Sequence, residues 1–99
     1  MVEASYSLGD GPDFVKILIF MFYTYILKSA RNSKYYVGYT SSIDGRLKLH
    51  NLGKVLATKN YRPWDLFYLE QFNTEKEAIN RERQIKFWKS RSMIEKLKF

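Results

Sequence analysis

Three segments of the chain combine β-branched and aromatic residues with an alternation of apolar and polar positions, which predicts β-strands. They cover residues 22–28, 35–40 and 66–72. Between the first two lies Ala30-Arg31-Asn32-Ser33, a run of turn-forming residues. The first two strands should therefore form an antiparallel hairpin.

Capping residues and helical spacing predict three helices. Ser42 can cap the first helix, and Gly53 is well placed to end it in a left-handed conformation. Thr74 and Glu77 form the S/T-x-x-E capping box that begins the second helix. The helices cover residues 43–52, 74–89 and 92–97, and residues 54–63 form a loop. The order β-β-α-β-α-α predicts an α+β fold, in which helices flank a small three-stranded antiparallel sheet.

The first twenty residues differ in character from the rest. Gly9, Gly11 and Pro12 lie among small polar residues without a strand or helix period. We expect residues 1–20 to be a largely disordered leader, and an upstream start codon before Met21 would account for it. The alternative is that residues 15–20 extend the first strand or pair with it. Residues 21–99 then form one domain, as expected from a chain of 99 residues.

The distribution of charged residues also changes after residue 20. Residues 1–20 hold one cation and three anions, so the remaining 79 residues carry 16 Lys and Arg against 7 Asp and Glu. A folded unit with this excess favours polyanions, of which nucleic acid and an anionic membrane surface are the main candidates. The alternative is a protein-interaction domain whose charge serves only solubility.

Composition excludes several classes of protein. The chain has no cysteine, so it holds neither a disulfide framework nor a zinc finger. No stretch approaches the roughly 18 apolar residues of a membrane span. The apolar run at residues 14–22 is interrupted by Lys16 and follows an acidic segment, unlike a signal peptide. We therefore expect a cytoplasmic protein without a membrane partner.

The predicted hairpin holds the first candidate functional residues. The face on which each side chain lies depends on the register of the hairpin. If the residue numbers of cross-strand partners add up to an odd number, as when Lys28 pairs with Tyr35, then Tyr25, Tyr36 and Gly38 share one face of the sheet. Two phenols could then project into one cleft. The alternative is that these tyrosines are ordinary strand aromatics.

Two helices supply further candidates. Arg46 and His50 lie four residues apart and share a helical face, although exposed residues at this spacing are often only solvated. Glu82 lies between Ala78 and Ile85 in an apolar helical pattern, where an unpaired buried carboxylate would cost several kcal/mol. It therefore needs a metal ion, a hydrogen-bond set or a cation, and a salt bridge to Arg46 is the structural alternative.

The end of the second long helix is rich in cations interleaved with Phe87 and Trp88. Such a helix could follow a phosphate backbone while both aromatic residues anchor it to the core, although charged runs are often only solvated faces. The candidate nucleic-acid contacts are Lys59, Arg62, Arg81, Arg83, Lys86, Lys89 and Arg91.

Taken together, these motifs resemble the GIY-YIG endonuclease superfamily, in particular its small stand-alone bacterial members and the catalytic module of the incision nuclease of bacterial excision repair. The first half-motif corresponds to Tyr23-Thr24-Tyr25 and the second to Tyr36-Val37-Gly38. Downstream, the family arginine and histidine fall on Arg46 and His50, and the family glutamate falls on Glu82. The ordered set is far more specific than either half-motif.

The resemblance implies a catalytic set of Tyr25, Tyr36, Arg46, His50 and Glu82. In this family Glu82 would hold one divalent metal, Mg²⁺ or Mn²⁺, together with waters and the substrate phosphate. Arg46 would neutralise charge that develops on the phosphate oxygens. Tyr25 would take a proton from the attacking water or orient that water, with Tyr36 and His50 in support. No small-molecule cofactor is implied.

Three positions depart from the family pattern. Tyr23 stands where the name-giving glycine would be, as in other small members, and Gly45 weakens the helix before Arg46 by about 1 kcal/mol relative to alanine. Repair-type members carry an asparagine where this chain has Ile94. That ligand or supporting residue is therefore missing.

The resemblance implies metal-dependent hydrolysis of phosphodiesters by an endonuclease that takes part in DNA repair. DNA is favoured over RNA, and the absence of a recognition domain favours structure-selective or nonspecific cutting. The alternative is a nucleic-acid-binding accessory module for DNA repair or RNA handling that cuts slowly or not at all. The sequence leaves the oligomeric state open.

Overall fold

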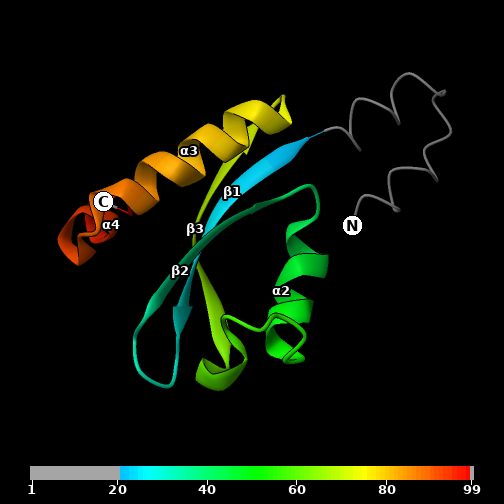
Figure 1. The fold of residues 1–99 in the computed structure, drawn as a ribbon, viewed down its shortest axis with the longest axis vertical. Coiled ribbons are helices and arrows are strands. Elements are labelled where there is room, and N and C mark those ends of the chain that lie inside the picture. Colours follow the sequence, from blue (N-terminus) through cyan, green and yellow to red (C-terminus); the bar gives the residue numbers. More distant parts are fainter. Residues whose placement is uncertain (1–20, 99) are drawn as a thin grey trace, which may run out of the picture.

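The computed structural model describes residues 21–98, and the predicted leader lies outside this range. Its centre is a three-stranded antiparallel sheet with the strand order β2-β1-β3, so the first strand lies in the middle (Figure 1). The order of strands and helices along the chain confirms the predicted α+β fold. The strands are β1 (Phe22–Ser29), β2 (Tyr35–Thr40) and β3 (Trp64–Phe72).

Within residues 21–98, three α-helices flank the sheet. Ser42 caps the first and accepts a hydrogen bond from the backbone of Gly45, while Gly53 has φ +78° after its end. Thr74 and Glu77 form both hydrogen bonds of the predicted capping box. The helices are α2 (Ile43–Asn51), α3 (Glu75–Trp88) and α4 (Arg91–Lys96), and the predicted loop contains a 3₁₀ turn, η2 (Lys59–Tyr61). None of the helices between residues 21 and 98 has the length and apolar character needed to cross a bilayer.

The register of the hairpin decides which side chains meet. Lys28 pairs with Tyr35 and Tyr25 pairs with Gly38, so the condition of an odd sum of paired residue numbers is met. Because side chains alternate between the faces of a strand, Tyr25, Tyr36 and Gly38 lie on one face. The register thus directs Tyr25 of β1 and Tyr36 of β2 toward the same side of the sheet.

Each face of the sheet has its own apolar core. On one face, Ile26 and Val37 pack against Ile85 of α3 and Ile94 of α4. On the other, the core residues Tyr25, Leu27 and Trp64 have partly buried residues of α2 packed against them. Figure 1 shows α3 and α2 on opposite sides of the strands. A residue of α3 can therefore meet residues of α2 only at the border of the sheet.

Strand β3 begins two residues earlier than predicted, at Trp64. The side chain of Asn51 explains this start, because its amide oxygen accepts a hydrogen bond from the Trp64 nitrogen at 2.7 Å and its amide nitrogen donates to the Trp64 oxygen at 3.0 Å. The Trp64 indole also donates to the carbonyl of Thr58 at 2.9 Å. These bonds fix the end of α2 against the sheet.

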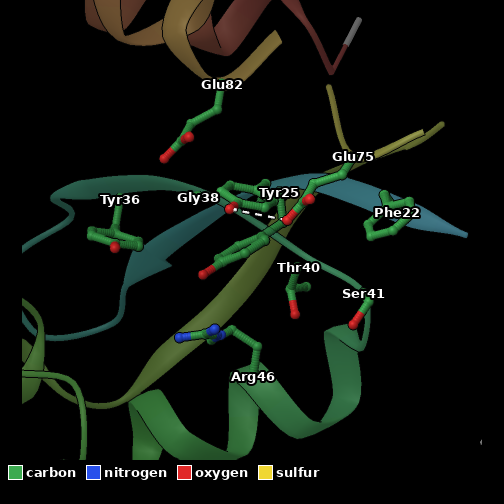
Figure 2. A pocket seen from close by; sticks show the side chains of 10 residues that line it. Phe22, Tyr25, Tyr36, Gly38, Thr40, Ser41, Arg46, Glu75 and Glu82 are labelled. Carbon is green, nitrogen blue, oxygen red and sulfur yellow. Dashed lines mark hydrogen bonds between the residues drawn. The ribbon is translucent and has the colours of Figure 1, made fainter. Parts of the chain in front are cut away.

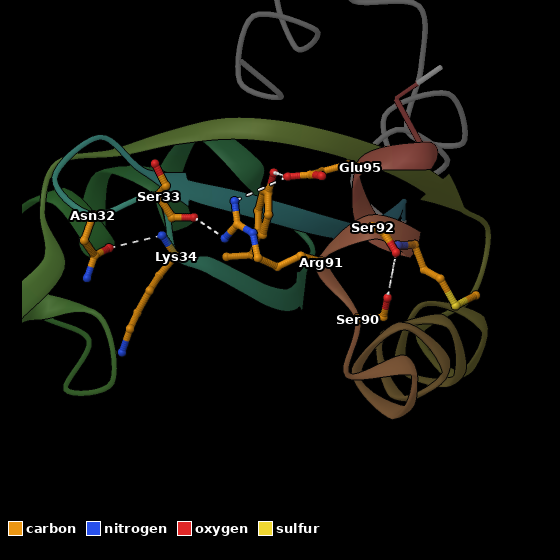
Figure 3. Close-up of polar contacts among 9 residues, drawn as sticks. Asn32, Ser33, Lys34, Ser90, Arg91, Ser92 and Glu95 are labelled. Carbon is orange, nitrogen blue, oxygen red and sulfur yellow. Dashed lines mark hydrogen bonds and ion pairs between the residues drawn. The ribbon is translucent and has the colours of Figure 1, made fainter.

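The turn between β1 and β2 is held by contacts with α4. Arg91 donates to the carbonyl of Ser33 at 2.7 Å and pairs with Glu95 at 3.3 Å (Figure 3). Its guanidinium carbon lies 4.6 Å from the centre of the Tyr35 ring, and the Tyr35 hydroxyl donates to Glu95 at 3.0 Å. Arg91 therefore has a structural role in joining the last helix to the hairpin.

The prediction that both Phe87 and Trp88 anchor α3 is wrong for Phe87, whose side chain is 83% exposed. Trp88 does pack against the core around Ile85. The reason is helical geometry: Trp88 lies three residues from Ile85 and shares its face, whereas Phe87 lies two residues away and points elsewhere.

Gly38 leaves room for the Tyr25 ring. A Cβ atom at Gly38 would lie 2.6 Å from the Tyr25 hydroxyl and 2.7 Å from the ring carbon that carries it. Tyr25 is only 2% exposed, so its ring cannot move aside freely. The glycine of the second half-motif is thus required by the tyrosine of the first.

We predict that Gly38→Ala lowers the free energy of unfolding by about 1–3 kcal/mol, since it overpacks a filled site. Urea denaturation of the full chain measures this loss. In a Tyr25→Leu background the atoms that clash are absent, so the same substitution should cost clearly less. An equal cost in both backgrounds would show that Tyr25 is not the reason for the glycine.

Candidate active site

Residues from both half-motifs, α2 and α3 line one open pocket with a volume of about 360 Å³. Glu82 enters it from α3 on one side and Arg46 from α2 on the other, with Tyr25 between them (Figure 2). The whole lining consists of Phe22, Tyr25, Tyr36, Gly38, Tyr39, Thr40, Ser41, Arg46, Glu75 and Glu82. Four of the five predicted catalytic residues therefore reach one space.

Arg46 owes its place to the short connection between β2 and α2. The Thr40 hydroxyl accepts a hydrogen bond from the Ser42 backbone at 3.1 Å and donates to the Ser42 carbonyl at 3.2 Å. This fixes the start of α2 beside the end of β2. Arg46 lies in the first turns of that helix and is half-buried. Its guanidinium thus reaches the space in front of the phenols, as Figure 2 shows.

His50 lies directly behind the pocket and belongs to a buried chain of hydrogen bonds. Its Nε2 lies 2.9 Å from the Tyr25 hydroxyl, and its Nδ1 lies 2.8 Å from the Thr58 hydroxyl. The Thr58 hydroxyl donates to the carbonyl of Val55 at 3.4 Å, so it accepts from Nδ1. Nε2 of a neutral imidazole is then the acceptor for the Tyr25 proton.

Burial sets the charge states of these two groups. His50 is fully buried, and burial, together with the nearby Arg46, lowers the pKa of its imidazole. Burial also raises the pKa of the Tyr25 phenol; Tyr36 and Glu82 raise this pKa further, while Arg46 lowers it. At neutral pH a protonated phenol therefore faces a neutral imidazole.

Tyr36 packs among the rings at the back of the pocket. Its ring centre lies 5.0 Å from that of His50 and 6.4 Å from those of Tyr25 and Trp64. The edge-to-face arrangement with His50 and Trp64 is a favourable one for aromatic rings. Tyr36 thus lines the pocket and supports His50 through packing.

Glu82 does not pair with Arg46, so the predicted alternative of a salt bridge between them is wrong. Its carboxylate lies 2.8 Å from the ammonium of Lys86, one turn further along α3. The Glu82 side chain is 15% exposed, so it has a path to solvent through the pocket. In Figure 2 the carboxylate points from α3 into the pocket.

A family model described as the GIY-YIG catalytic domain matches residues 21–97. The chain belongs to the GIY-YIG family. Among its relatives is a UPF0213 protein of Staphylococcus haemolyticus, 45% identical over 65 residues, which are 65% of this chain and 78% of that protein. A UPF0213 protein of Pediococcus pentosaceus is 39% identical over 83 residues, 83% of each chain.

A solution NMR structure of a UPF0213 protein from Bacillus halodurans is also similar. It is 33% identical, the match covers 78% of this chain and 81% of that one, and the TM-score is 0.49. The relatives are small bacterial proteins, which confirms the resemblance to stand-alone GIY-YIG members.

The donor set of this GIY-YIG pocket suits a hydrated hard cation. Glu82 supplies a carboxylate to an open, polar-lined space, and Glu75 supplies a second one from the same helix. Among residues 21–98 there is no group of three or more histidine, cysteine or acidic side chains that could enclose a metal. Mg²⁺ commonly binds through one or two carboxylates and keeps its waters, so the residues present fit it and Mn²⁺.

The position where repair-type members carry asparagine is occupied by a core residue. Ile94 is 9% exposed and packs with Ile26, Val37 and Ile85 on the far face of the sheet. It contributes nothing to the pocket. The pocket residues available for chemistry therefore come from the half-motifs, α2 and α3.

The predicted nucleic-acid contacts do not form one surface of unengaged cations. Arg81 pairs with Glu70 at 2.8 Å and stacks over Trp88, and the Arg62 side chain donates to the carbonyl of Lys59 at 2.7 Å. Lys86 pairs with Glu82, and Arg91 holds the hairpin turn. Exposed cations are found at Lys59, Arg83 and Lys89, among others.

Sequence reasoning missed Glu75, Thr40 and Ser41 in the pocket and Thr58 behind it. Glu75 lies seven residues before Glu82, two helical turns away on the same face, so helical spacing could have found it. Thr40 follows Gly38 by two residues on the same face of β2. Thr58 lies in an irregular loop, where no periodicity points to it.

The lowered pKa of His50 predicts a pH dependence of stability. The unfolded chain takes up a proton near pH 6.5 and the folded one only at lower pH, so stability is present above pH 6.5 and falls as the pH drops below it. The slope cannot exceed about 1.4 kcal/mol per pH unit for one proton.

Urea denaturation between pH 7.5 and 5.5 tests this prediction. His50 is the chain's single histidine, so His50→Gln should lack the loss of stability over this range. An identical pH slope in the two proteins would mean that His50 is not buried as a neutral imidazole.

Proposed function

We propose that this GIY-YIG protein hydrolyses phosphodiester bonds of nucleic acid with the help of one divalent metal ion. The observation that supports the proposal most strongly is the shared pocket, in which a carboxylate, an arginine and two phenols come from three separate parts of the chain. Such a set can hold a metal, neutralise a phosphate and position water within one space.

Glu82 would hold the metal, Mg²⁺ or Mn²⁺, with Glu75 at the rim of the same pocket. When bound, the metal supplies positive charge that stabilises the leaving oxygen of the phosphodiester. Arg46, on the opposite side of the pocket, binds the non-bridging oxygens and offsets the charge that develops on them.

The hydrogen-bond chain behind the pocket supports a role for Tyr25 in proton transfer. The Tyr25 hydroxyl donates to Nε2 of neutral His50, so its oxygen presents lone pairs to the pocket. As water attacks, the phenol oxygen takes a proton from it and passes its own proton to His50. A phenol whose pKa is raised can act in this way because the imidazole removes its proton as the new one arrives.

DNA is the favoured substrate, with nonspecific or structure-selective cutting, and the protein works as a small bacterial nuclease in the cytoplasm. The excess of basic residues after residue 20 supports a polyanionic substrate. The arginine and the carboxylates of the pocket are groups that suit phosphate, metal and water, which are common to every nucleotide.

The experiment is cleavage of supercoiled plasmid and of branched DNA with Mg²⁺ or Mn²⁺. We predict that Glu82→Gln and Tyr25→Phe each lower the rate by about a hundredfold or more, since each removes a group that acts in the transition state. Asp65→Asn, which changes an exposed carboxylate on β3 outside the pocket lining, serves as a control for loss of a surface carboxylate and should cut at the parent rate.

Parent-like cutting by both variants would contradict the assignment of this pocket as the active site. If the parent binds DNA but leaves it intact under every metal condition, the protein is a nucleic-acid-binding accessory module and the proposal of hydrolysis is wrong.

A further inference from the structure

Glu82, the proposed metal ligand, forms an ion pair with Lys86. The Lys86 ammonium is 2.8 Å from a carboxylate oxygen of Glu82, and the two residues are one helical turn apart on α3. The order along the helix, with glutamate before lysine, is the favourable one for an i,i+4 pair. Among residues 21–98, Lys86 is the cation within salt-bridge distance of this carboxylate.

We propose that Lys86 competes with the divalent metal for Glu82 and releases the carboxylate when a nucleic-acid phosphate binds the lysine instead. The inference rests on the proposed function, because it assigns a further positioning residue to the same site. It makes binding of metal depend on binding of substrate.

The two side chains differ in exposure in a way that suits this exchange. Glu82 is 15% exposed and points into the pocket (Figure 2), whereas Lys86 is 52% exposed and contacts the Glu82 carboxylate from one turn further along α3. A half-exposed ion pair is weak, so it lowers the affinity for metal without abolishing it. A lysine on a long flexible stem can also turn toward a neighbouring phosphate at little cost.

Electrostatics gives the direction of the effect. An ammonium held against Glu82 removes a lone pair that a metal would use and repels a divalent cation a few ångströms away. A phosphate at the pocket reverses both effects, because it draws the ammonium away and adds its own oxygen ligand. By thermodynamic linkage, metal and nucleic acid should each strengthen binding of the other.

The test is calorimetric titration of the full chain with Mn²⁺ in the absence of nucleic acid. We expect Lys86→Met to bind Mn²⁺ about three- to tenfold more tightly than the parent. Lys76→Met removes the same charge from an exposed site on the first turn of α3 and should change the affinity by less than about twofold. A merely structural role for Lys86 would leave the affinity unchanged or lower it, and either result overturns the inference.

A second titration measures the linkage. The titration uses the Tyr25→Phe variant, which should leave a short DNA duplex intact. We expect the duplex to increase the Mn²⁺ affinity of this variant by a larger factor than that of the double variant Tyr25→Phe, Lys86→Met. An equal increase in Mn²⁺ affinity in the two proteins would show that Lys86 does not couple the binding of metal to the binding of DNA.

Glu82→Gln separates failure of this inference from failure of the proposed function. If Glu82→Gln loses Mn²⁺ binding while Lys86→Met matches the parent, the metal site stands and the role of Lys86 is wrong. If Glu82→Gln binds Mn²⁺ as the parent does, Glu82 is not the metal ligand and both proposals fall.

Discussion

The buried hydrogen bond between Tyr25 and His50 joins the central strand to α2, and the geometry of the pocket depends on it. It lies at 2.9 Å between two side chains that are almost completely buried. Gly38 makes room for the phenol, and Thr58 orients the imidazole. Since a buried donor or acceptor left without a partner costs about 1–3 kcal/mol, this chain of contacts constrains strand, helix and loop together. It also brings Arg46 on the same helix to the mouth of the pocket.

The sheet separates the two halves of the site. The phenols and Arg46 lie on the face covered by α2, whereas α3 packs on the opposite face through Ala78 and Ile85. Glu82 reaches the first face because it projects from α3 into the pocket at the border of the sheet (Figure 2). A carboxylate in that position is close to solvent and to the phenols, yet it does not disturb either apolar core. In the proposed function, a metal would be added to this carboxylate after folding, without a preformed cage.

Periodicity and capping residues were sufficient to predict most of the fold. The odd register that places Tyr25, Tyr36 and Gly38 on one face could be stated as a condition on the hairpin, and it holds. Ser42 and Gly53 marked the two ends of α2, and Thr74 and Glu77 marked the start of α3. Contacts between residues distant in sequence were harder to predict. Thr58 supports His50 from an irregular loop, and Glu82 pairs with its helical neighbour Lys86, not with Arg46 on α2. Such choices depend on packing distances that local patterns do not encode.

The central claim is that Glu82 holds a divalent metal beside Tyr25 and Arg46 when nucleic acid occupies the pocket. The most direct measurement is a crystal structure of the protein with Mn²⁺ and a short DNA duplex, with the ion located by its anomalous scattering. The account predicts a peak at roughly 2.0–2.3 Å from a Glu82 carboxylate oxygen, with a phosphate between it and Arg46. An ion bound elsewhere, or a duplex bound away from the pocket with Glu82 still paired to Lys86, would contradict it.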